Sequence, residues 1–182
     1  MKAGSSGDPR PGRGEGGRSL ALRDLLFTLV VPGIGAVYAP WSILVARGVS
    51  PRPVAWPAAG IIVVGALLYF SCVWVFAIAG RGTPGPWDAP RRLVVVGPYR
   101  WVRNPIDLAA LLVVVGEAWL FFSADLLIYA GAMAVAFHLF VVRYEERTLR
   151  ARFGDQYDAY RRAVSRWIPR PPGDLGRGRR GG

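Results

Sequence analysis

Cysteine is almost absent from the sequence, and no internal repeat is found. Cys72 is the only cysteine among the 182 residues, so the chain can form neither an intramolecular disulfide nor a cysteine-based metal site. The last residues, GRRGG, also lack the cysteine of a prenylation signal. We therefore expect no metal, and we expect any membrane attachment to come from the polypeptide itself.

Charged residues are missing from several long stretches, although the chain as a whole is basic. The formal net charge is +11, while 52% of the residues are hydrophobic. A soluble protein that binds nucleic acid seldom contains long uncharged stretches, so nucleic acid is disfavoured as a partner. The composition favours an all-α integral membrane protein, with the lipid bilayer as its surroundings.

Four apolar runs are candidates for membrane-spanning helices. The second run, residues 58–80, is the strongest candidate, because it has no charged residue and is about as long as the roughly 20 residues that a hydrocarbon core requires. The first is too long for a signal-peptide core and contains Pro32 and Pro40, either of which can bend a helix. Only three residues separate the last two runs, which predicts a tight helical hairpin. The predicted spans are residues 25–46, 58–80, 106–122 and 126–142.

Arginines lie almost entirely on one side of this arrangement. If the spans alternate in direction, Arg47 and Arg52 alone lie on the side opposite to the tails. Cytoplasmic loops retain Lys and Arg, so both termini and the functional face are predicted to be cytoplasmic. Both tails are basic and too poor in apolar residues to order themselves. The expected organisation is a disordered tail, a membrane domain and a second disordered tail, at residues 1–23, 24–170 and 171–182.

The loop after the second predicted span is rich in Gly, Pro and Arg and begins GRG. Gly80 and Gly82 would let a ligand approach the backbone closely, and exposed backbone N–H groups can bind an anion. A helix C-cap explains Gly80 equally simply. Both interpretations remain open on the sequence.

The same loop ends in GPYRWVRNP, where Arg100 and Arg103 would share a face if the segment is helical. Two such arginines can clamp a carboxylate or a phosphate. Anchoring at a lipid surface explains them too, with Tyr99 and Trp101 as interfacial aromatic residues. Asn104 precedes Pro105, so capping of the next helix is its simplest explanation.

Three acidic positions and a histidine remain near or within the later spans. Ionisable groups inside a membrane are costly, so Glu117 and His138 should face a cavity or a partner helix. His138 lies two helical turns before the adjacent Glu145 and Glu146, so the three share a face in a continuous α-helix. That face can line a pocket, and hydrogen bonds between helices are the alternative.

The glutamate pair stands where the last predicted span ends. Apolar side chains recur every three or four residues after it among arginines, which predicts a helix lying in the membrane interface, with Gly154 as a point of interruption. Carboxylates placed there can be partly desolvated and still reachable from the cytoplasm. Surface ion pairs with Arg143, Arg147 or Arg150 are the plain alternative. The apolar positions are Leu149, Phe153, Tyr157, Tyr160 and Val164.

Four segments together resemble the isoprenylcysteine carboxyl methyltransferase and phospholipid methyltransferase superfamily, whose members are integral membrane enzymes that use S-adenosylmethionine. The segments are GRGTP, GPYRWVRNP, VVRYEERTLRARFGDQYDAYRR and RWIPR, and they span roughly residues 80–170. The resemblance implies that the glycines and the glutamate pair contribute to cofactor binding and that Arg100 or Arg103 takes the methionyl carboxylate. The expected cofactor-binding residues are Gly80, Gly82, Tyr99, Arg100, Arg103, Asn104, Glu145 and Glu146, and the candidates for the acceptor pocket are Asp107, Glu117 and His138.

The sequence departs from the superfamily's commoner RHPxYxG pattern at Asn104, Asp107 and Ala109. Asn can form hydrogen bonds but cannot transfer a proton near neutrality, so the resemblance carries no acid–base role for Asn104. The implied function is methyl transfer from S-adenosylmethionine to a lipophilic acceptor, such as a prenylcysteine carboxylate or a phospholipid. The alternatives are a non-catalytic membrane scaffold of the same fold and a small transporter that uses Glu117 and His138.

Overall fold

The computed structural model describes residues 33–50, 55–79 and 93–171, and it is built from helices, with no β-strand in these ranges. This confirms the predicted all-α class. The predicted tails lie almost wholly outside the described residues, as do Pro32, Gly80 and Gly82. In chain order the elements are η1 (Ile34–Tyr38), α2 (Ala39–Arg47), α3 (Trp56–Ala79), η2 (Gly97–Arg100), α4 (Pro105–Phe121), α5 (Ala124–Phe140), η3 (Val141–Glu145), α6 (Glu146–Phe153) and α7 (Asp155–Ala163).

Two helices are long and apolar enough to cross a membrane: Trp56–Val75 within α3, and the continuous helix Ala124–Phe153 formed by α5, η3 and α6. The helix of η1 and α2 is shorter, and α4 has 17 residues, so the predicted count of four spans remains a prediction. The helix Ala124–Phe153 has 30 residues and is ~45 Å long, more than the hydrocarbon core requires. Its uncharged apolar run ends at Val142, so the glutamate pair lies just beyond the end of the predicted span.

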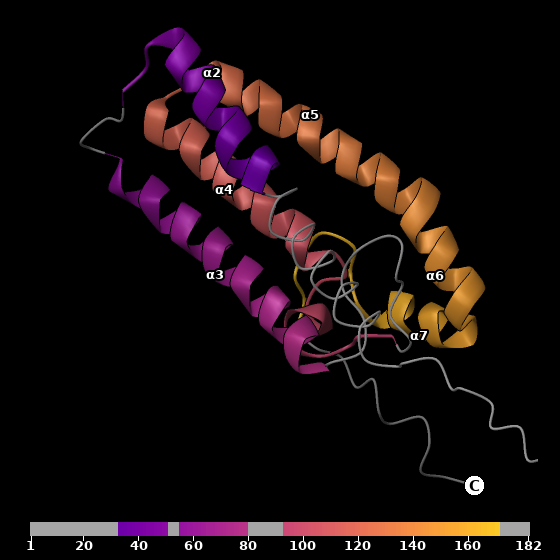
Figure 1. Ribbon diagram of the computed structural model, residues 1–182. Coiled ribbons are helices and arrows are strands. Elements are labelled where there is room, and N and C mark those ends of the chain that lie inside the picture. Colours follow the sequence, from indigo (N-terminus) through magenta and orange to yellow (C-terminus); the bar gives the residue numbers. More distant parts are fainter. Residues whose placement is uncertain (1–32, 51–54, 80–92, 172–182) are drawn as a thin grey trace, which may run out of the picture.

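Small residues bring α3 and α4 close together, and α4 lies between α3 and α5 (Figure 1). A Cβ atom added to Gly116 would lie 2.6 Å from Cγ1 of Ile62, and one added to Gly65 would lie 2.9 Å from the carbonyl oxygen of Ala109. Ala58 and Ala109 are fully buried. Such small-residue contacts are typical of helix pairs in lipid, where close van der Waals packing replaces the hydrophobic effect.

The loop between α4 and α5 forms the predicted tight hairpin. Phe122 ends α4 in the left-handed conformation, with a φ of 48°. Ser123 then caps α5, because its hydroxyl oxygen accepts a hydrogen bond of 3.3 Å from the amide of Leu126. The side chain of Leu126 is completely buried beneath this turn. A polar cap and an apolar anchor thus fix the reversal of direction.

The first helical segment packs against this hairpin. Its backbone is π-helical over η1, which ends two residues before Pro40, and the predicted bend at Pro32 or Pro40 stays a prediction. The hydroxyl group of Tyr129 on α5 donates a hydrogen bond of 2.7 Å to the carbonyl oxygen of Gly35. At the other end of α2, Arg47 forms an ion pair of 3.0 Å with Asp125.

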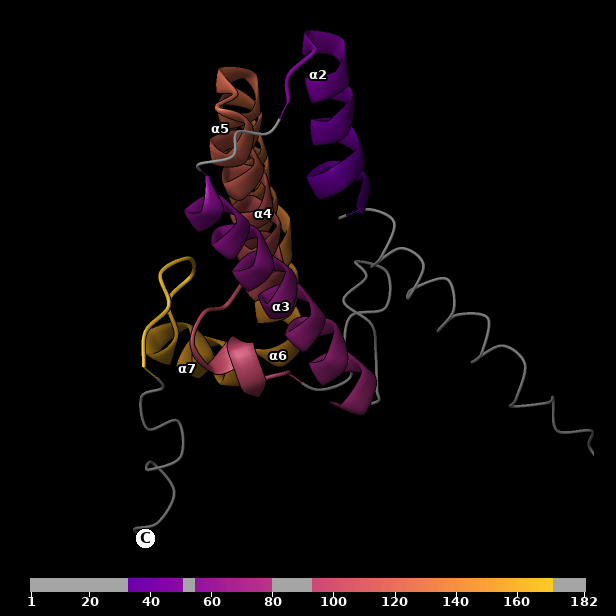
Figure 2. The ribbon, with the colours of Figure 1, turned by 90° about the vertical axis from the view of Figure 1, so that its left-hand side faces the viewer.

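The C-terminal helices α6 and α7 gather at one end of the bundle, near the last turns of α3 (Figure 2). Gly154 separates them with a φ of 52°, which confirms the predicted interruption. The apolar stripe beyond the glutamate pair is largely covered by protein, because Tyr157, Tyr160 and Val164 are buried together against Leu93 and Val95. The stripe therefore builds a small core that holds residues 93–104 and 155–170 together.

Candidate functional site

The segment that follows η2 separates the two arginines of the GPYRWVRNP motif. The short helix η2 ends at Arg100, so Arg103 does not lie on the same helical face. Arg100 is exposed, whereas only 10% of the Arg103 side chain is exposed. The condition for a shared face, a helix that includes both arginines, is therefore not met, and Arg103 alone is placed in the interior.

Residues 165–170 run alongside this segment and hold it through backbone hydrogen bonds. The amide of Arg103 donates to the carbonyl oxygen of Ser165 over 2.9 Å, and the amide of Arg170 donates to the carbonyl oxygen of Trp101 over 3.0 Å. We call residues 165–170 the C-terminal strap. It joins the segment that follows α7 to the start of α4.

Asn104 occupies the N-cap position of α4, with Pro105 in the first turn as predicted, but its side chain makes no capping hydrogen bond. Its Nδ2 atom donates instead to the carbonyl oxygen of Arg166 over 3.2 Å. The expectation of a capping side chain is therefore wrong. The strap offers an acceptor that a local sequence pattern does not reveal, and Asn104 is a link between α4 and the strap.

Glu146 joins two arginines that lie far apart in the sequence. Its Oε1 atom lies 3.0 Å from Nη1 of Arg103 and 2.7 Å from Nε of Arg166, and its Oε2 atom lies 3.0 Å from Nη2 of Arg166. Burial by itself raises the pKa of Glu146, but the hydrogen bonds from Arg166 and the charge of Arg103 hold this pKa below its usual value. Glu146 is therefore an anion locked in a two-arginine network, not a partner of Arg143, Arg147 or Arg150.

Glu145 has a different environment from its neighbour. It is half-buried, and no described residue forms a hydrogen bond or an ion pair with its carboxylate. Burial, followed by the charges of Asp107 and Glu146, raises the pKa of Glu145 to about 7, although Arg103 acts in the opposite sense. This carboxylate is therefore available to a cationic ligand or to hydroxyl donors.

Tyr99 and Asp107 belong to the same neighbourhood as Glu145. Burial, and then nearby groups that include Cys72, Glu145 and Asp107, raise the pKa of Tyr99. Four predicted site residues, Tyr99, Arg103, Asp107 and Glu145, therefore come together around the start of α4.

Arg103 has an unused donor. Its Nη1 atom faces Glu146 and lies 3.5 Å from the hydroxyl of Tyr157, while its Nε atom is buried without a hydrogen-bond partner among the described residues. A buried donor that is left unpaired costs roughly 1–3 kcal/mol. The hydroxyl of Ser165 on the strap is also buried and unpaired within the described ranges. Both atoms could therefore form hydrogen bonds with a polar ligand.

The two candidates from the predicted spans, His138 and Glu117, have other surroundings. His138 is exposed on α5, and its Nδ1 atom accepts a hydrogen bond of 3.2 Å from Nε1 of Trp167 on the strap. Glu117 lies near the end of α4 that is distant from Asp107, and its Oε2 atom is buried without a partner in the described part of the chain. The π-helical turn η3 also adds a residue between His138 and Glu145, which changes the face expected for a continuous α-helix.

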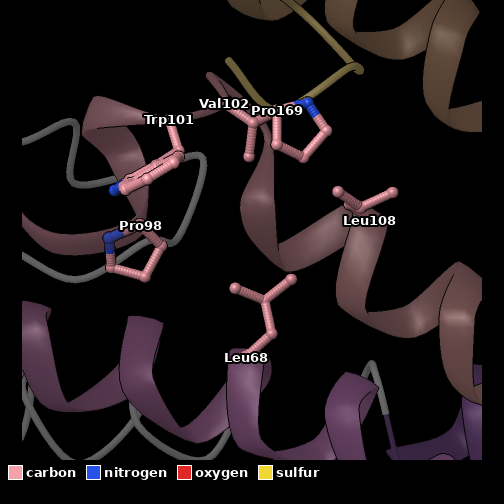
Figure 3. A pocket seen from close by; sticks show the side chains of 6 residues that line it. All are labelled: Leu68, Pro98, Trp101, Val102, Leu108 and Pro169. Carbon is pink, nitrogen blue, oxygen red and sulfur yellow. The ribbon is translucent and has the colours of Figure 1, made fainter. Parts of the chain in front are cut away.

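An apolar cavity of about 320 Å³ opens beside the cluster (Figure 3). Leu68 of α3 and Leu108 of α4 point into it, and Pro98, Trp101, Val102 and Pro169 line it from η2, the following segment and the strap. All six lining side chains are apolar or aromatic, so the cavity favours an apolar group. In the described ranges, no cluster of three or more His, Cys, Asp or Glu side chains could hold a metal ion.

Sequence reasoning missed the role of the strap. Arg166 forms the bidentate contact with Glu146, and Tyr157 and Ser165 lie at the same network. The RWIPR segment, which begins at Arg166, was a signal that could have pointed to it. The segment was recognised as part of the resemblance, but its residues were not assigned to the site.

Comparison with known proteins identifies the family. The model of the phospholipid methyltransferase family matches residues 54–156, which is more than half of the chain. The chain belongs to this family. The resemblance inferred from the motifs is thereby confirmed, and the matched region contains the glutamate pair, Arg103 and the cavity-lining residues of α3 and α4.

A curated relative gives a second, partial match. The chain is 44% identical over 73 residues to the methanethiol S-methyltransferase of Mycobacterium tuberculosis. That match covers 40% of this chain and 29% of the relative, so most of the relative's length has no counterpart in the alignment. No solved structure matches the chain significantly. Together, the family and the relative support a methyltransferase, and the family and the two long apolar helices indicate a membrane protein.

The site residues fit the methyl donor that methyltransferases usually employ, S-adenosylmethionine. Its carboxylate matches the unpaired, buried Nε donor of Arg103, and its ammonium and ribose hydroxyl groups match the carboxylate of Glu145. Glu146 is less available, because Arg103 and Arg166 already occupy both of its oxygens. The chemistry of these donors and acceptors therefore suits a zwitterionic, cationic nucleoside.

Proposed function

We propose that the protein is an S-adenosylmethionine-dependent methyltransferase that acts on a lipophilic or membrane-associated acceptor. The observation that carries this proposal is a cluster beside an apolar cavity, which combines the available carboxylate of Glu145 with the buried Nε atom of Arg103, an atom without a hydrogen-bond partner among the described residues. The family supports the reaction class.

Arg103 would hold the methionyl carboxylate, and Glu145 would accept hydrogen bonds from the ammonium or ribose hydroxyl groups. Tyr99 and Asn104 would contribute to cofactor binding, because both lie in the segment that carries Arg103. Gly80 and Gly82 complete the proposed set from the GRG motif. The exposed Arg100 is the weakest of the proposed contacts.

When bound, S-adenosylmethionine would supply an electrophilic methyl group for in-line transfer to a nucleophile of the acceptor, with S-adenosylhomocysteine as the leaving group. This chain's residues would align the two molecules and exclude water, which accelerates a displacement without a covalent enzyme intermediate. The negative charge of Glu145 would stabilise a nearby sulfonium cation. A thiolate or carboxylate acceptor requires no base, whereas an amine acceptor must be neutral, and Asp107, whose charge acts on Glu145, could then accept a proton.

The apolar cavity would take the lipophilic part of the acceptor. Its lining supplies contact area without charged groups, so it suits an isoprenoid or acyl chain better than a polar metabolite. The name of the partial relative adds a small thiol as a second acceptor to test. Four spans with both termini in the cytoplasm remain the proposed topology, and His138 and Glu117 remain candidates for acceptor contacts.

A methyl-transfer assay tests the proposal. Full-length protein in lipid nanodiscs is incubated with methyl-labelled S-adenosylmethionine and, separately, a farnesylated cysteine, phosphatidylethanolamine or an alkanethiol. The proposal expects label in one of these acceptors and an equal amount of S-adenosylhomocysteine. Binding of S-adenosylmethionine without transfer to any acceptor, including those of a total lipid extract, would favour a non-catalytic scaffold of the same fold.

A further inference from the structure

The guanidinium group of Arg103 is held from one side only. Glu146 contacts its Nη1 atom at 3.0 Å, and Nε remains buried and unpaired among the described residues. Nε and Nη2 form the edge with which an arginine grips a carboxylate through two parallel hydrogen bonds. Arg166 uses this same edge to grip Glu146, through Nε at 2.7 Å and Nη2 at 3.0 Å. The Nε–Nη2 edge of Arg103 is therefore not used by any described residue and could bind a carboxylate.

The orientation of the Glu146 carboxylate is fixed by its contacts. Arg166 fixes both of its oxygens, and the strap that carries Arg166 is fixed by the hydrogen bonds of Ser165, Arg166 and Arg170 to the segment around Arg103. The chain of contacts Arg166–Glu146–Arg103 thus crosses three separate parts of the sequence. Each link is charged, and the exposed fraction of the side chain is 10% for Arg103 and 11% for Glu146. Such a network orients its last member well, because each group has few alternative partners.

We propose that Arg166 is a positioning residue for recognition of the ligand's carboxylate. It acts through Glu146, which holds Arg103 so that the Nε edge is presented to a carboxylate of the bound nucleoside. The two adjacent glutamates then have different tasks: Glu145 contacts the ligand, and Glu146 orients Arg103. This inference rests on the proposed function, because it takes S-adenosylmethionine as the ligand.

Two probes separate positioning from general support of the fold. S-adenosylmethionine has the carboxylate, and its decarboxylated form lacks only that group while it keeps the adenosine, the sulfonium and the amine. Equilibrium binding of each probe to full-length protein in detergent is measured by calorimetry. Wild type is expected to bind S-adenosylmethionine about tenfold more tightly than the decarboxylated form.

Arg166→Gln is expected to weaken the binding of S-adenosylmethionine about tenfold and to change the binding of the decarboxylated form less than about twofold. Arg166→Lys keeps the positive charge but loses the two parallel donors of the guanidinium group, so it should retain part of the affinity that Arg166→Gln loses. It also serves as the test if Arg166→Gln fails to fold. Arg162→Lys, on the exposed surface of α7, is the matched control and should leave both affinities unchanged.

Equal weakening of both probes by the Arg166 substitutions would overturn the inference, since loss of general support does not depend on the carboxylate. Equal binding of both probes by wild type would also overturn it and would leave the proposed function standing. Failure of folded wild type to bind either probe would overturn the proposed function itself.

Discussion

The hydroxyl group of Tyr160 donates a hydrogen bond of 2.7 Å to the carbonyl oxygen of Tyr99, 61 residues earlier in the chain. This bond joins α7 to η2 directly beside the segment that carries Arg103. The geometry of the candidate site therefore depends on a helix that has no membrane-spanning role.

Removal of this hydroxyl group should loosen the site. Tyr160→Phe keeps the buried ring but leaves the carbonyl oxygen of Tyr99 without this donor, so the free energy of unfolding should fall by about 1–2 kcal/mol. Thermal unfolding in detergent measures the change. Tyr144→Phe, at an exposed tyrosine of η3, is the control. Equal effects of the two substitutions would show that the Tyr160–Tyr99 bond contributes nothing specific.

Alanine should have opposite effects at Gly116, which lies in the contact between α3 and α4, and at Gly131, which lies outside this contact on α5. Gly116→Ala places a Cβ atom 2.6 Å from Cγ1 of Ile62 and 3.1 Å from two backbone atoms of α3, so the helices must separate. A loss of about 1–3 kcal/mol is expected, more than the gain in helix propensity of about 1 kcal/mol. Gly131→Ala meets no atom within 4 Å and should be neutral or stabilising. A thermal midpoint that is unchanged in Gly116→Ala would contradict the close packing.

The environment of Glu145 predicts how stability changes with pH. Because its pKa is raised from 4.5 to about 7, folded protein without ligand binds an extra proton between these values. The corresponding stabilisation is complete below pH 4.5 and is lost as the pH rises to 7, and it amounts to on the order of 3 kcal/mol. The lowered pKa of Glu146 acts in a separate window, below pH 4.5, where stability is lost as the pH falls.

Thermal midpoints of wild type and Glu145→Gln, measured from pH 5 to pH 8, isolate this contribution. The midpoint of wild type should fall relative to that of the variant as the pH rises, because glutamine does not titrate. A constant difference between the two proteins over this range would contradict the raised pKa of Glu145.

Much of the fold could be predicted because its signals are local. Uncharged runs predicted the helices, the three residues after the third run predicted the hairpin, and Gly154 predicted the break between α6 and α7. The packing faces could not be predicted, because helices such as α3 are apolar all round and carry no periodic pattern. Only the structure shows that Gly65 and Gly116 mark the contact.

The site was predictable in its residue types but not in its contacts. The resemblance placed Arg103, Asn104 and the glutamate pair among the cofactor-binding residues, and in the structure these residues lie in one neighbourhood. It could not predict that Arg166 would take both oxygens of Glu146, since this contact joins residues that are 20 positions apart across a helix break. The different tasks proposed for Glu145 and Glu146 depend on that tertiary contact. In the sequence the two glutamates are adjacent and identical, so nothing there distinguishes them.

The most direct test of the account is equilibrium binding of S-adenosylmethionine to purified full-length wild type, Glu145→Gln and Asp155→Asn. Loss of a charged hydrogen-bond acceptor in Glu145→Gln should weaken saturable binding about tenfold, whereas Asp155→Asn, at an exposed acidic residue of α7, should bind as wild type does. This result would establish Glu145 as part of the cofactor site. Absence of binding by folded wild type, or identical affinities for wild type and Glu145→Gln, would contradict the account.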